Sequence, residues 1–194
     1  MQNLNFSQPK KLILIAASTG GPGLIEKILK SFPRPINATV ILLQHMDRFN
    51  LESFSRRLSR VNSLNIQLIE KNSDLLHGEI YLLADTATLQ KHQGEIYFQK
   101  ETLHKGFYHP TIDELFFSAA QLKDIEIAAY LLSGIGSDGA KGLLALKNAD
   151  SKTVAQDEKS SIVYGMPKAA FEIGACQYVM SIDEIIDDIQ KELY

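Results

Sequence analysis

A run of seven almost entirely aliphatic residues passes directly into a serine and a glycine-rich turn near the start of the chain. The run, 11–17, shows no alternation of apolar and polar residues, which is typical of a strand buried on both faces of a parallel sheet. In Ser18-Thr-Gly-Gly-Pro22, the proline suits the first turn of a helix, where its missing N–H is not needed. Apolar residues then recur on one helical face, at Leu24, Ile25, Ile28 and Leu29. The predicted unit is strand, tight turn and helix, with Ser18 at the carboxyl edge of a sheet beside free helical N–H groups.

Strand and helix patterns alternate along the rest of the chain. Strands are predicted at 38–44, 65–70, 125–132, 152–156 and 177–180. Helices are predicted at 51–61, at 111–123, over Leu143 to Leu146, at 166–172 and at 182–193, with Thr111 as an N-cap. Between 76 and 99 the apolar segments, including 78–84, are short and separated by turn residues. They predict an antiparallel, hairpin-containing excursion at the edge of the sheet.

This order of elements predicts an α/β fold with a doubly wound, mostly parallel sheet, Rossmann-like, and a short antiparallel hairpin elaboration. The 194 residues suit one domain, 11–194, preceded by an N-terminal tail over 1–10. We detect no internal repeat, low-complexity tract or interdomain linker in the sequence.

Charge and composition exclude several classes of partner. A net charge of -3 gives no general attraction to nucleic acid or to anionic membranes. No apolar run approaches the roughly 20 residues of a membrane span, and the first residues do not resemble a signal peptide, so a cytoplasmic location is predicted. Cys176 is the only cysteine, which excludes an internal disulfide and a cysteine-rich metal site, and its apolar neighbours favour an inert core thiol.

Three of the predicted strands lead into a serine, a histidine and an aspartate, namely Ser18, His45 and Asp138. In open α/β sheets, ligands bind outside the carboxyl ends of the strands. An imidazole that takes the serine proton and a carboxylate that holds the imidazole tautomer are the groups that activate an alcohol nucleophile. Each residue alone is more often a turn, cap or surface residue, but their joint occurrence at corresponding strand ends favours catalysis.

The glycine-rich turns also admit a second interpretation, phosphate binding. The segment Gly134-Ile-Gly-Ser-Asp-Gly139 has the spacing of part of a dinucleotide fingerprint, between a strand and a helix. It occurs late in the chain, no acidic ribose partner follows except the distant Asp157, and neither turn carries a phosphate-loop lysine. Nucleotide binding is therefore the secondary hypothesis. In the catalytic interpretation, the Thr19 N–H donates to a tetrahedral oxyanion.

The order Ser, His, Asp and the sequence around Ser18 both differ from those of α/β-hydrolases. Instead, the segments 17–22, 44–46, 110–116, 133–142, 155–158 and 165–167 closely resemble the catalytic domain of the chemotaxis protein-glutamate methylesterase (CheB) family. The resemblance runs from about residue 11 to residue 180. The chain departs from the family pattern at Ala16, at Ile135 and over 83–88, and the last departure leaves the receptor partner open.

The resemblance implies a signal-transduction enzyme, a serine-dependent hydrolase of glutamate γ-methyl esters on methylated chemoreceptors, with release of methanol. Family members often also deamidate receptor glutamines. Ser18 would be the nucleophile, His45 the general base and then acid, and Asp138 its orienting residue, with Thr19 and Ile135 as backbone donors to the oxyanion. No metal or organic cofactor is implied, and His104 and His109 are interpreted as loop residues.

The sequence carries no receiver domain before the predicted catalytic domain. Constitutive activity, control by a separate regulatory protein, or origin as a piece of a longer product are the alternatives. Arginines at 56, 57 and 60 are interpreted as a solvated helix face rather than as a docking site for acidic receptor helices. The competing class of function is a non-enzymatic receptor or signalling module on the same fold. The presence of Ser18, His45 and Asp138 together argues against it.

Overall fold

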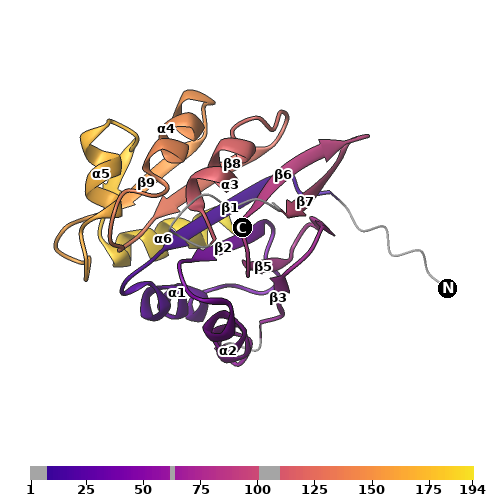
Figure 1. Cartoon of the computed structure of the whole chain (residues 1–194), viewed down its shortest axis with the longest axis horizontal. Coiled ribbons are helices and arrows are strands. Elements are labelled where there is room, and N and C mark those ends of the chain that lie inside the picture. The colour runs from indigo at the N-terminus through magenta and orange to yellow at the C-terminus, as the bar shows by residue number, and fades with distance from the viewer. Residues whose placement is uncertain (1–7, 62–63, 101–109) are drawn as a thin grey trace.

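A computed structural model describes residues 8–61, 64–100 and 110–194 of the chain (Figure 1). The strands within these ranges are β1 (Lys11–Ala17), β2 (Thr39–Gln44), β3 (Ile66–Ile69), β4 (Ser73–Asp74), β5 (Ile80–Leu83), β6 (Ala87–His92), β7 (Glu95–Lys100), β8 (Glu126–Leu131), β9 (Lys152–Gln156) and β10 (Tyr178–Met180). The helices are α1 (Gly21–Lys30), α2 (Arg48–Leu58), α3 (Ile112–Ala119), α4 (Ala140–Asn148), α5 (Met166–Glu172) and α6 (Ile182–Glu192).

A seven-stranded parallel sheet in the order β10-β9-β8-β1-β2-β5-β3 forms the centre of the molecule. Strand β1 lies between β2 and β8, and its register pairs Ala17 with Gln44 on one side and Ala16 with Leu131 on the other. From β1 the chain extends the sheet first toward β2 and later, through β8, in the opposite direction. The strand order therefore reverses beside β1, and such reversals are where open α/β sheets bind their ligands.

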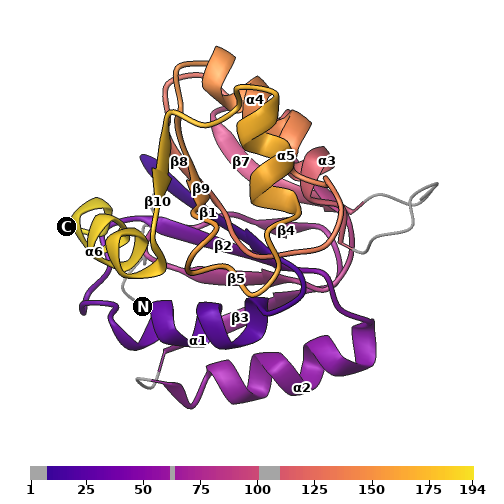
Figure 2. The same ribbon diagram turned by 90° about the vertical axis from the view of Figure 1, so that its left-hand side faces the viewer.

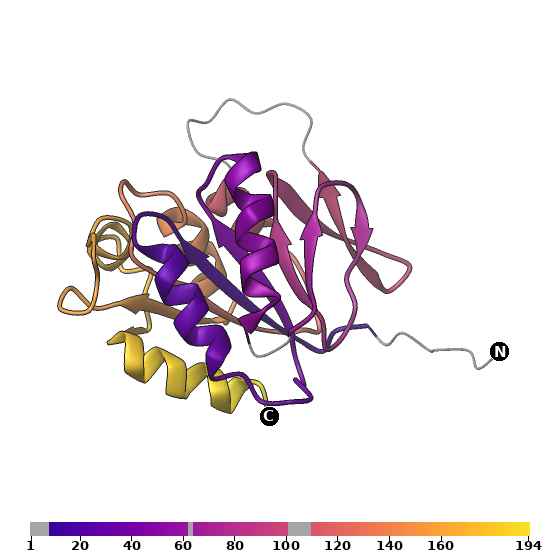
Figure 3. The ribbon, with the colours of Figure 1, turned by 90° about the horizontal axis from the view of Figure 1, so that it is seen from below.

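Helices cover both faces of this sheet, as expected for a doubly wound fold. Figures 2 and 3 show α1, α2 and α6 on one face, and Figure 2 shows α3, α4 and α5 on the other. Successive residues of β1 enter opposite cores, because side chains alternate along a strand. Leu12 and Leu14 pack with α3 and α4, whereas Ile13 and Ile15 pack with α1, α2 and α6. This double burial explains the unbroken aliphatic sequence of β1, and it confirms the predicted fold class.

The antiparallel part of the molecule is smaller than the sequence predicts. Strands β6 and β7 form the predicted hairpin and join β4 in a separate three-stranded sheet. Strand β5, however, was predicted within this excursion, and that assignment is wrong. It pairs in parallel with both β2 and β3 inside the main sheet, and all four of its residues are buried. A short apolar run fits a buried parallel strand and a hairpin strand equally well.

Helices α2 and α3 differ most clearly from their predicted ranges, whereas α6 ends one residue before the predicted position and α4 extends beyond Leu143 to Leu146 at both ends. Helix α2 begins at Arg48 instead of Leu51, because the Asp47 carboxylate accepts a hydrogen bond from the Asn50 N–H at 3.0 Å and caps the helix. Helix α3 ends at Ala119, short of the predicted range. Thr111 occupies the predicted N-cap position of α3, but its side chain makes no capping hydrogen bond. The group that caps this helix comes from elsewhere in the chain.

Candidate active site

Ser18 lies in the turn that joins β1 to α1, at the centre of the carboxyl edge of the sheet. The turn is closed by the Gly21 N–H, which donates to the Ser18 carbonyl at 2.9 Å, and Gly20 adopts a φ of 85°. Only glycine takes this left-handed conformation without strain. The Ser18 side chain is 9% exposed, and within the described residues its hydroxyl makes no hydrogen bond. The turn thus presents a largely buried hydroxyl at the end of the central strand.

His45 follows Gln44 at the end of the neighbouring strand β2. Because Ala17 and Gln44 are partners in the parallel register, Ser18 and His45 occupy equivalent positions on adjacent strands, which lie about 4.8 Å apart. The His45 N–H also continues the ladder by donating to the Ala17 carbonyl at 3.0 Å. The register therefore brings together the serine and the histidine that the sequence singles out.

Asp138 reaches the same edge from the loop that follows β8, on the other side of β1. It is 8% exposed, and its Oδ2 lies 2.8 Å from His45 Nε2. The same carboxylate accepts hydrogen bonds from the Ile112 N–H at 2.8 Å and from the Asp113 N–H at 3.0 Å. Asp138 is thus the missing cap of α3, and it joins the amino end of that helix to the histidine.

The electrostatics of this pair determine the tautomer of His45. Burial alone would raise the pKa of Asp138, but the hydrogen bonds from His45, Ile112 and Asp113 outweigh burial and hold the pKa below its ordinary value of 3.8. The carboxylate is therefore ionised at neutral pH and can only accept hydrogen bonds. It follows that His45 Nε2 carries the proton in this contact, and that Nδ1 is the basic nitrogen of the neutral ring.

Thr19 and Ile135, the two predicted backbone donors, lie on either side of Ser18. Thr19 directly follows Ser18, and Ile135 follows Gly134, which lies against the Ser18 side chain: a Cβ built on Gly134 would be 2.7 Å from Ser18 Cβ. Within the described part of the chain, neither the Thr19 N–H nor the Ile135 N–H donates a hydrogen bond. Both donors are therefore available to an anion that forms at Ser18.

Three buried polar residues that were not predicted from the sequence form hydrogen bonds around the ends of the central strands. Gln44 Nε2 donates to the Ser18 carbonyl at 2.8 Å and to the His45 carbonyl at 3.0 Å. Ser133 Oγ donates to the Thr19 carbonyl at 2.7 Å, and the Ser133 N–H donates to Gln156 Oε1 at 2.9 Å. Gln44 and Ser133 follow buried, mostly aliphatic runs, as Ser18 does, and Gln156 is the last residue of the buried strand β9. That shared position is the signal that could have identified them.

Apolar surface surrounds Ser18. Ile135 is 55% exposed, and Ile162, which contacts the turn at Gly20, is 69% exposed. Next to His45 a cleft of about 390 Å³ lies between the start of α1 and helix α2, lined by Pro22, Met46, Asn50, Ser53, Phe54 and Arg57. The exposed surface near the Ser18 turn is thus partly apolar, and the cleft begins at Met46, the residue after His45.

The remaining candidates from the sequence are not part of the Ser18, His45 and Asp138 arrangement, although Arg57 lines the neighbouring cleft. Burial raises the pKa of the Cys176 thiol to about 11, which agrees with the predicted inert thiol. Arg57 is exposed, stacks on Phe54 at 5.1 Å and lies 3.5 Å from Glu26. His104 and His109 fall outside the described residues. Within the described ranges, no three His, Cys, Asp or Glu side chains form a group that could hold a metal ion.

None of the described helices is both long enough and apolar enough to cross a membrane.

Comparison with known proteins gives a consistent result. A family model described as CheB methylesterase matches residues 13–189. A protein of Carboxydothermus hydrogenoformans named protein-glutamate methylesterase/protein-glutamine glutaminase 1 is 36% identical over 190 residues, which are 95% of this chain and 56% of that protein. A Pyrococcus horikoshii protein named protein-glutamate methylesterase/protein-glutamine glutaminase is 34% identical over 183 residues, 92% of this chain and 50% of that protein. The chain thus spans about half the length of the curated relatives it matches.

Among solved structures, the Thermotoga maritima CheB methylesterase catalytic domain is similar over almost its entire length. The two chains superpose with a TM-score of 0.87 at 26% sequence identity, and the match covers 95% of this chain and 98% of the other. The similarity therefore includes the sheet, both helical layers and the edge that carries Ser18.

Proposed function

The chain belongs to the CheB methylesterase family, and from that premise we propose that it hydrolyses γ-methyl esters of protein glutamates to glutamate and methanol. The observation that carries the proposal is the hydrogen bond between His45 Nε2 and the ionised Asp138. His45 follows β2 at the position that corresponds to Ser18 after β1. That arrangement provides a base whose tautomer is fixed, next to an alcohol.

In the first half of the proposed reaction, Ser18 Oγ attacks the ester carbonyl carbon. His45 Nδ1 takes the hydroxyl proton as the Oγ–C bond forms, and Asp138 stabilises the resulting imidazolium. The carbonyl oxygen becomes an oxyanion, to which the N–H groups of Thr19 and Ile135 donate. When the oxyanion collapses, the bond to the methoxy oxygen breaks. Nδ1 returns the proton to that oxygen, and methanol leaves.

In the second half, water hydrolyses the acyl-enzyme ester on Ser18. His45 takes one proton from the water, the hydroxide attacks the same carbonyl carbon, and the bond to Ser18 Oγ breaks as Ser18 regains its proton. The product is a glutamate carboxyl group, which ionises at neutral pH. Ionisation makes the hydrolysis effectively one-way, because the carboxylate resists attack by methanol.

The proposed substrates are methyl-accepting chemotaxis receptors, with glutamine side chains of the same receptors as amide substrates. The names of the relatives support both activities, since they pair methylesterase with glutaminase. The amide reaction uses the same steps and releases ammonia instead of methanol. The cleft that begins next to His45, at Met46, is the proposed place for receptor residues that flank the reacting side chain.

The test is methanol release from receptor membranes carrying labelled methyl esters, with the wild-type chain compared with Ser18→Ala. We expect release by the wild type and none by the variant, because alanine cannot form the acyl-enzyme. Ser31→Ala is the matched control. Its hydroxyl bonds the Ile28 carbonyl at the far end of α1, so this variant should release methanol at the wild-type rate.

Circular dichroism and thermal melting would establish that all three proteins are folded. Equal release by the wild type and Ser18→Ala would refute the assignment of the nucleophile. Absence of release by a folded wild-type chain, on receptor membranes and on a short peptide with a glutamate methyl ester, would refute an independently active esterase.

A further inference from the structure

Asp138 caps a helix other than the one it precedes. It lies in the turn before α4, yet its carboxylate accepts from the Ile112 and Asp113 N–H groups in the first turn of α3. An N-cap side chain normally bonds the first turn of its own helix. The side-chain hydrogen bond to the first turn of α4 is therefore made by another residue.

Asp113 takes that role. It lies in the first turn of α3, and its Oδ1 accepts a hydrogen bond from the Gly142 N–H, in the first turn of α4, at 2.7 Å. The two helices therefore exchange caps: the carboxylate before α4 caps α3, and the carboxylate in α3 caps α4. Carboxylates are favourable at both positions because they oppose the positive ends of the helix dipoles.

Two glycines allow the exchange by letting the helix ends approach closely. A Cβ built on Gly142 would lie 2.5 Å from Phe116 Cβ and 3.0 Å from the Asp113 carbonyl oxygen. A Cβ on Gly139 would lie 2.7 Å from a methyl carbon of Ile112, and Gly139 also has a φ of 87°. The approach of α3 to α4 is thus fixed by close packing as well as by the exchanged caps.

This arrangement sets two carboxylates side by side in a largely buried place. Burial raises the pKa of Asp113, the neighbouring Asp138 raises it further, and the Gly142 N–H opposes both effects. The raised pKa means that the ionised form of Asp113 costs stability, as expected for a buried charge beside a like charge.

Asp138 Oδ2 is the atom through which the exchange reaches the active site. The same oxygen lies 2.8 Å from the Ile112 N and 2.8 Å from His45 Nε2. A shift of the turn before α4 relative to α3 therefore moves the carboxylate off the imidazole. We propose that Asp113 is a positioning residue of the esterase, which holds the turn of Asp138 against α3 and so keeps Asp138 on His45. The inference rests on the proposed function.

The test compares four variants of the full chain on a peptide with a glutamate methyl ester. For Asp113→Ala we expect kcat to fall about 10²-fold, because a displacement of about 1 Å can cost that much, with KM little changed. Asp113→Asn keeps an acceptor at Oδ1 for the Gly142 N–H and should retain most of the activity. Asp113→Glu keeps the charge but displaces the acceptor, and should lose about tenfold. Ser181→Ala removes the cap of α6 instead, and should lower stability without changing kcat.

A second readout does not depend on catalysis. The His45 Nε2 proton, held by an ionised carboxylate, should give a downfield proton NMR signal in the wild type, in Asp113→Asn and in Ser181→Ala. The signal should be lost or broadened in Asp113→Ala and weakened in Asp113→Glu. If Asp113→Ala does not fold, Asp113→Glu takes its place.

Retention of both the signal and kcat in a folded Asp113→Ala or Asp113→Glu would overturn the proposal. A higher activity of the Glu variant than of the Asn variant would also overturn it, since charge rather than position would then matter. If the wild type hydrolyses no ester, the proposed function fails, and the NMR signal still decides whether Asp113 holds Asp138 on His45.

Discussion

At the scale of single residues, Gln44 joins the two halves of the site through one amide group. Its Nε2 donates to the carbonyls of both Ser18 and His45, and its side chain is almost completely buried at 1% exposure. The amide therefore ties the carboxyl end of β1 to that of β2, beyond the last pair of the ladder. Buried polar groups of this kind are costly to leave unpaired, which makes the position sensitive.

Replacing Gln44 by Met tests this role, because methionine has a similar length and volume but no donor. Two carbonyls lose a partner, so we expect stability to fall by about 1–3 kcal/mol and kcat to fall by at least tenfold as Ser18 and His45 shift. Gln67→Met is the control: Gln67 Nε2 donates to Glu79 at 3.0 Å in a strand remote from the site. Stability follows from urea unfolding and kcat from peptide-ester hydrolysis. An unchanged kcat in Gln44→Met would show that Gln44 contributes to stability only and does not position Ser18 and His45.

Gly134 offers a second test at this scale, based on volume rather than on hydrogen bonds. An added methyl group would lie 2.2 Å from Met166 Sδ and 2.7 Å from Ser18 Cβ. Met166 can rearrange, but Ser18 Cβ is fixed to the backbone, so Gly134→Ala should move Ser18, the proposed nucleophile, and abolish most ester hydrolysis. Gly23→Ala is the control, because nothing lies within 4 Å of its Cβ in α1. It should stabilise the protein by about 0.5–1 kcal/mol and preserve activity. A fully active Gly134→Ala would contradict the tight placement of Ser18.

At the scale of elements, periodicity and turn residues predict most of the fold from the sequence. Strand β1, strand β9 and helix α5 have the predicted bounds, since aliphatic runs and glycine or proline delimit them locally. Strand β5 was misplaced because its partners β2 and β3 are distant in sequence. Likewise, Ser18, His45 and Asp138 are predicted from the strand ends, whereas the exchanged caps are not. No local pattern shows that Asp138 caps α3 or that Asp113 caps α4.

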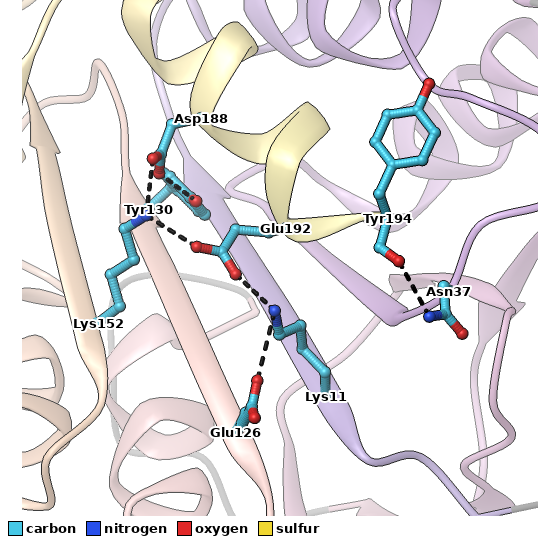
Figure 4. A network of polar contacts seen from close by, with 8 residues as sticks. All are labelled: Lys11, Asn37, Glu126, Tyr130, Lys152, Asp188, Glu192 and Tyr194. Atoms are coloured by element: carbon cyan, nitrogen blue, oxygen red, sulfur yellow. Dashed lines mark hydrogen bonds and ion pairs between the residues drawn. The ribbon is translucent and has the colours of Figure 1, made fainter.

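Helix α6 is attached to the amino edge of the sheet by an ion-pair network (Figure 4). Glu192 lies 2.7 Å from Lys11 and 2.8 Å from Lys152, and Lys152 also contacts Asp188 at 2.7 Å. Tyr130 donates its hydroxyl proton to Asp188 at 2.7 Å. The network joins β1, β8, β9 and α6, although these elements lie far apart in the sequence.

This network predicts a pH-dependent contribution of Glu192 to stability. Burial would raise the pKa of Glu192, but Lys11 and Lys152 outweigh burial and hold the pKa below its ordinary value of 4.5. A carboxyl group that is more acidic in the folded state stabilises the protein above its unfolded pKa, and this contribution disappears as the pH falls through the folded pKa. Glu192→Gln should therefore have a lower Tm than the wild type at pH 7, by about 4–8 °C for a loss of about 2 kcal/mol. The difference should shrink below pH 4.

Thermal melting of both proteins between pH 2.5 and pH 7 checks this expectation. Glu126→Gln is the matched control, since Glu126 contacts the same Lys11 at 3.4 Å but its side chain is 77% exposed. An exposed pair contributes about 0–1 kcal/mol, so its Tm should change little at any pH. A difference between wild type and Glu192→Gln that stays constant down to pH 2.5 would show that the network does not act through the charge of Glu192.

At the scale of the whole molecule, the network and the proposed active site lie at opposite edges of the same sheet. Glu192 bonds Lys11, the first residue of β1, whereas Gln44 pairs with Ala17, the last residue of that strand. Seven residues of strand separate the two edges, which is about 20 Å. Among the described residues, the ion pairs of the network and the His45–Asp138 contact have no residue in common. Stability can therefore depend on the amino edge of the sheet while the proposed catalysis depends on the carboxyl edge.

This separation predicts that substitutions at the two edges act independently. The double variant Gln44→Met/Glu192→Gln should lose the sum of the two single losses in unfolding free energy, within about 0.5 kcal/mol, because the sites are distant and share no partner. Its kcat should equal that of Gln44→Met alone.

By contrast, Gln44→Met/Gly134→Ala combines two changes around Ser18, and its losses should not add. Urea unfolding and ester hydrolysis of the wild type and the five variants measure both cycles. A coupling above 1 kcal/mol between Gln44 and Glu192 would mean that the sheet transmits strain along β1, and stability at the amino edge would then also affect the placement of Ser18.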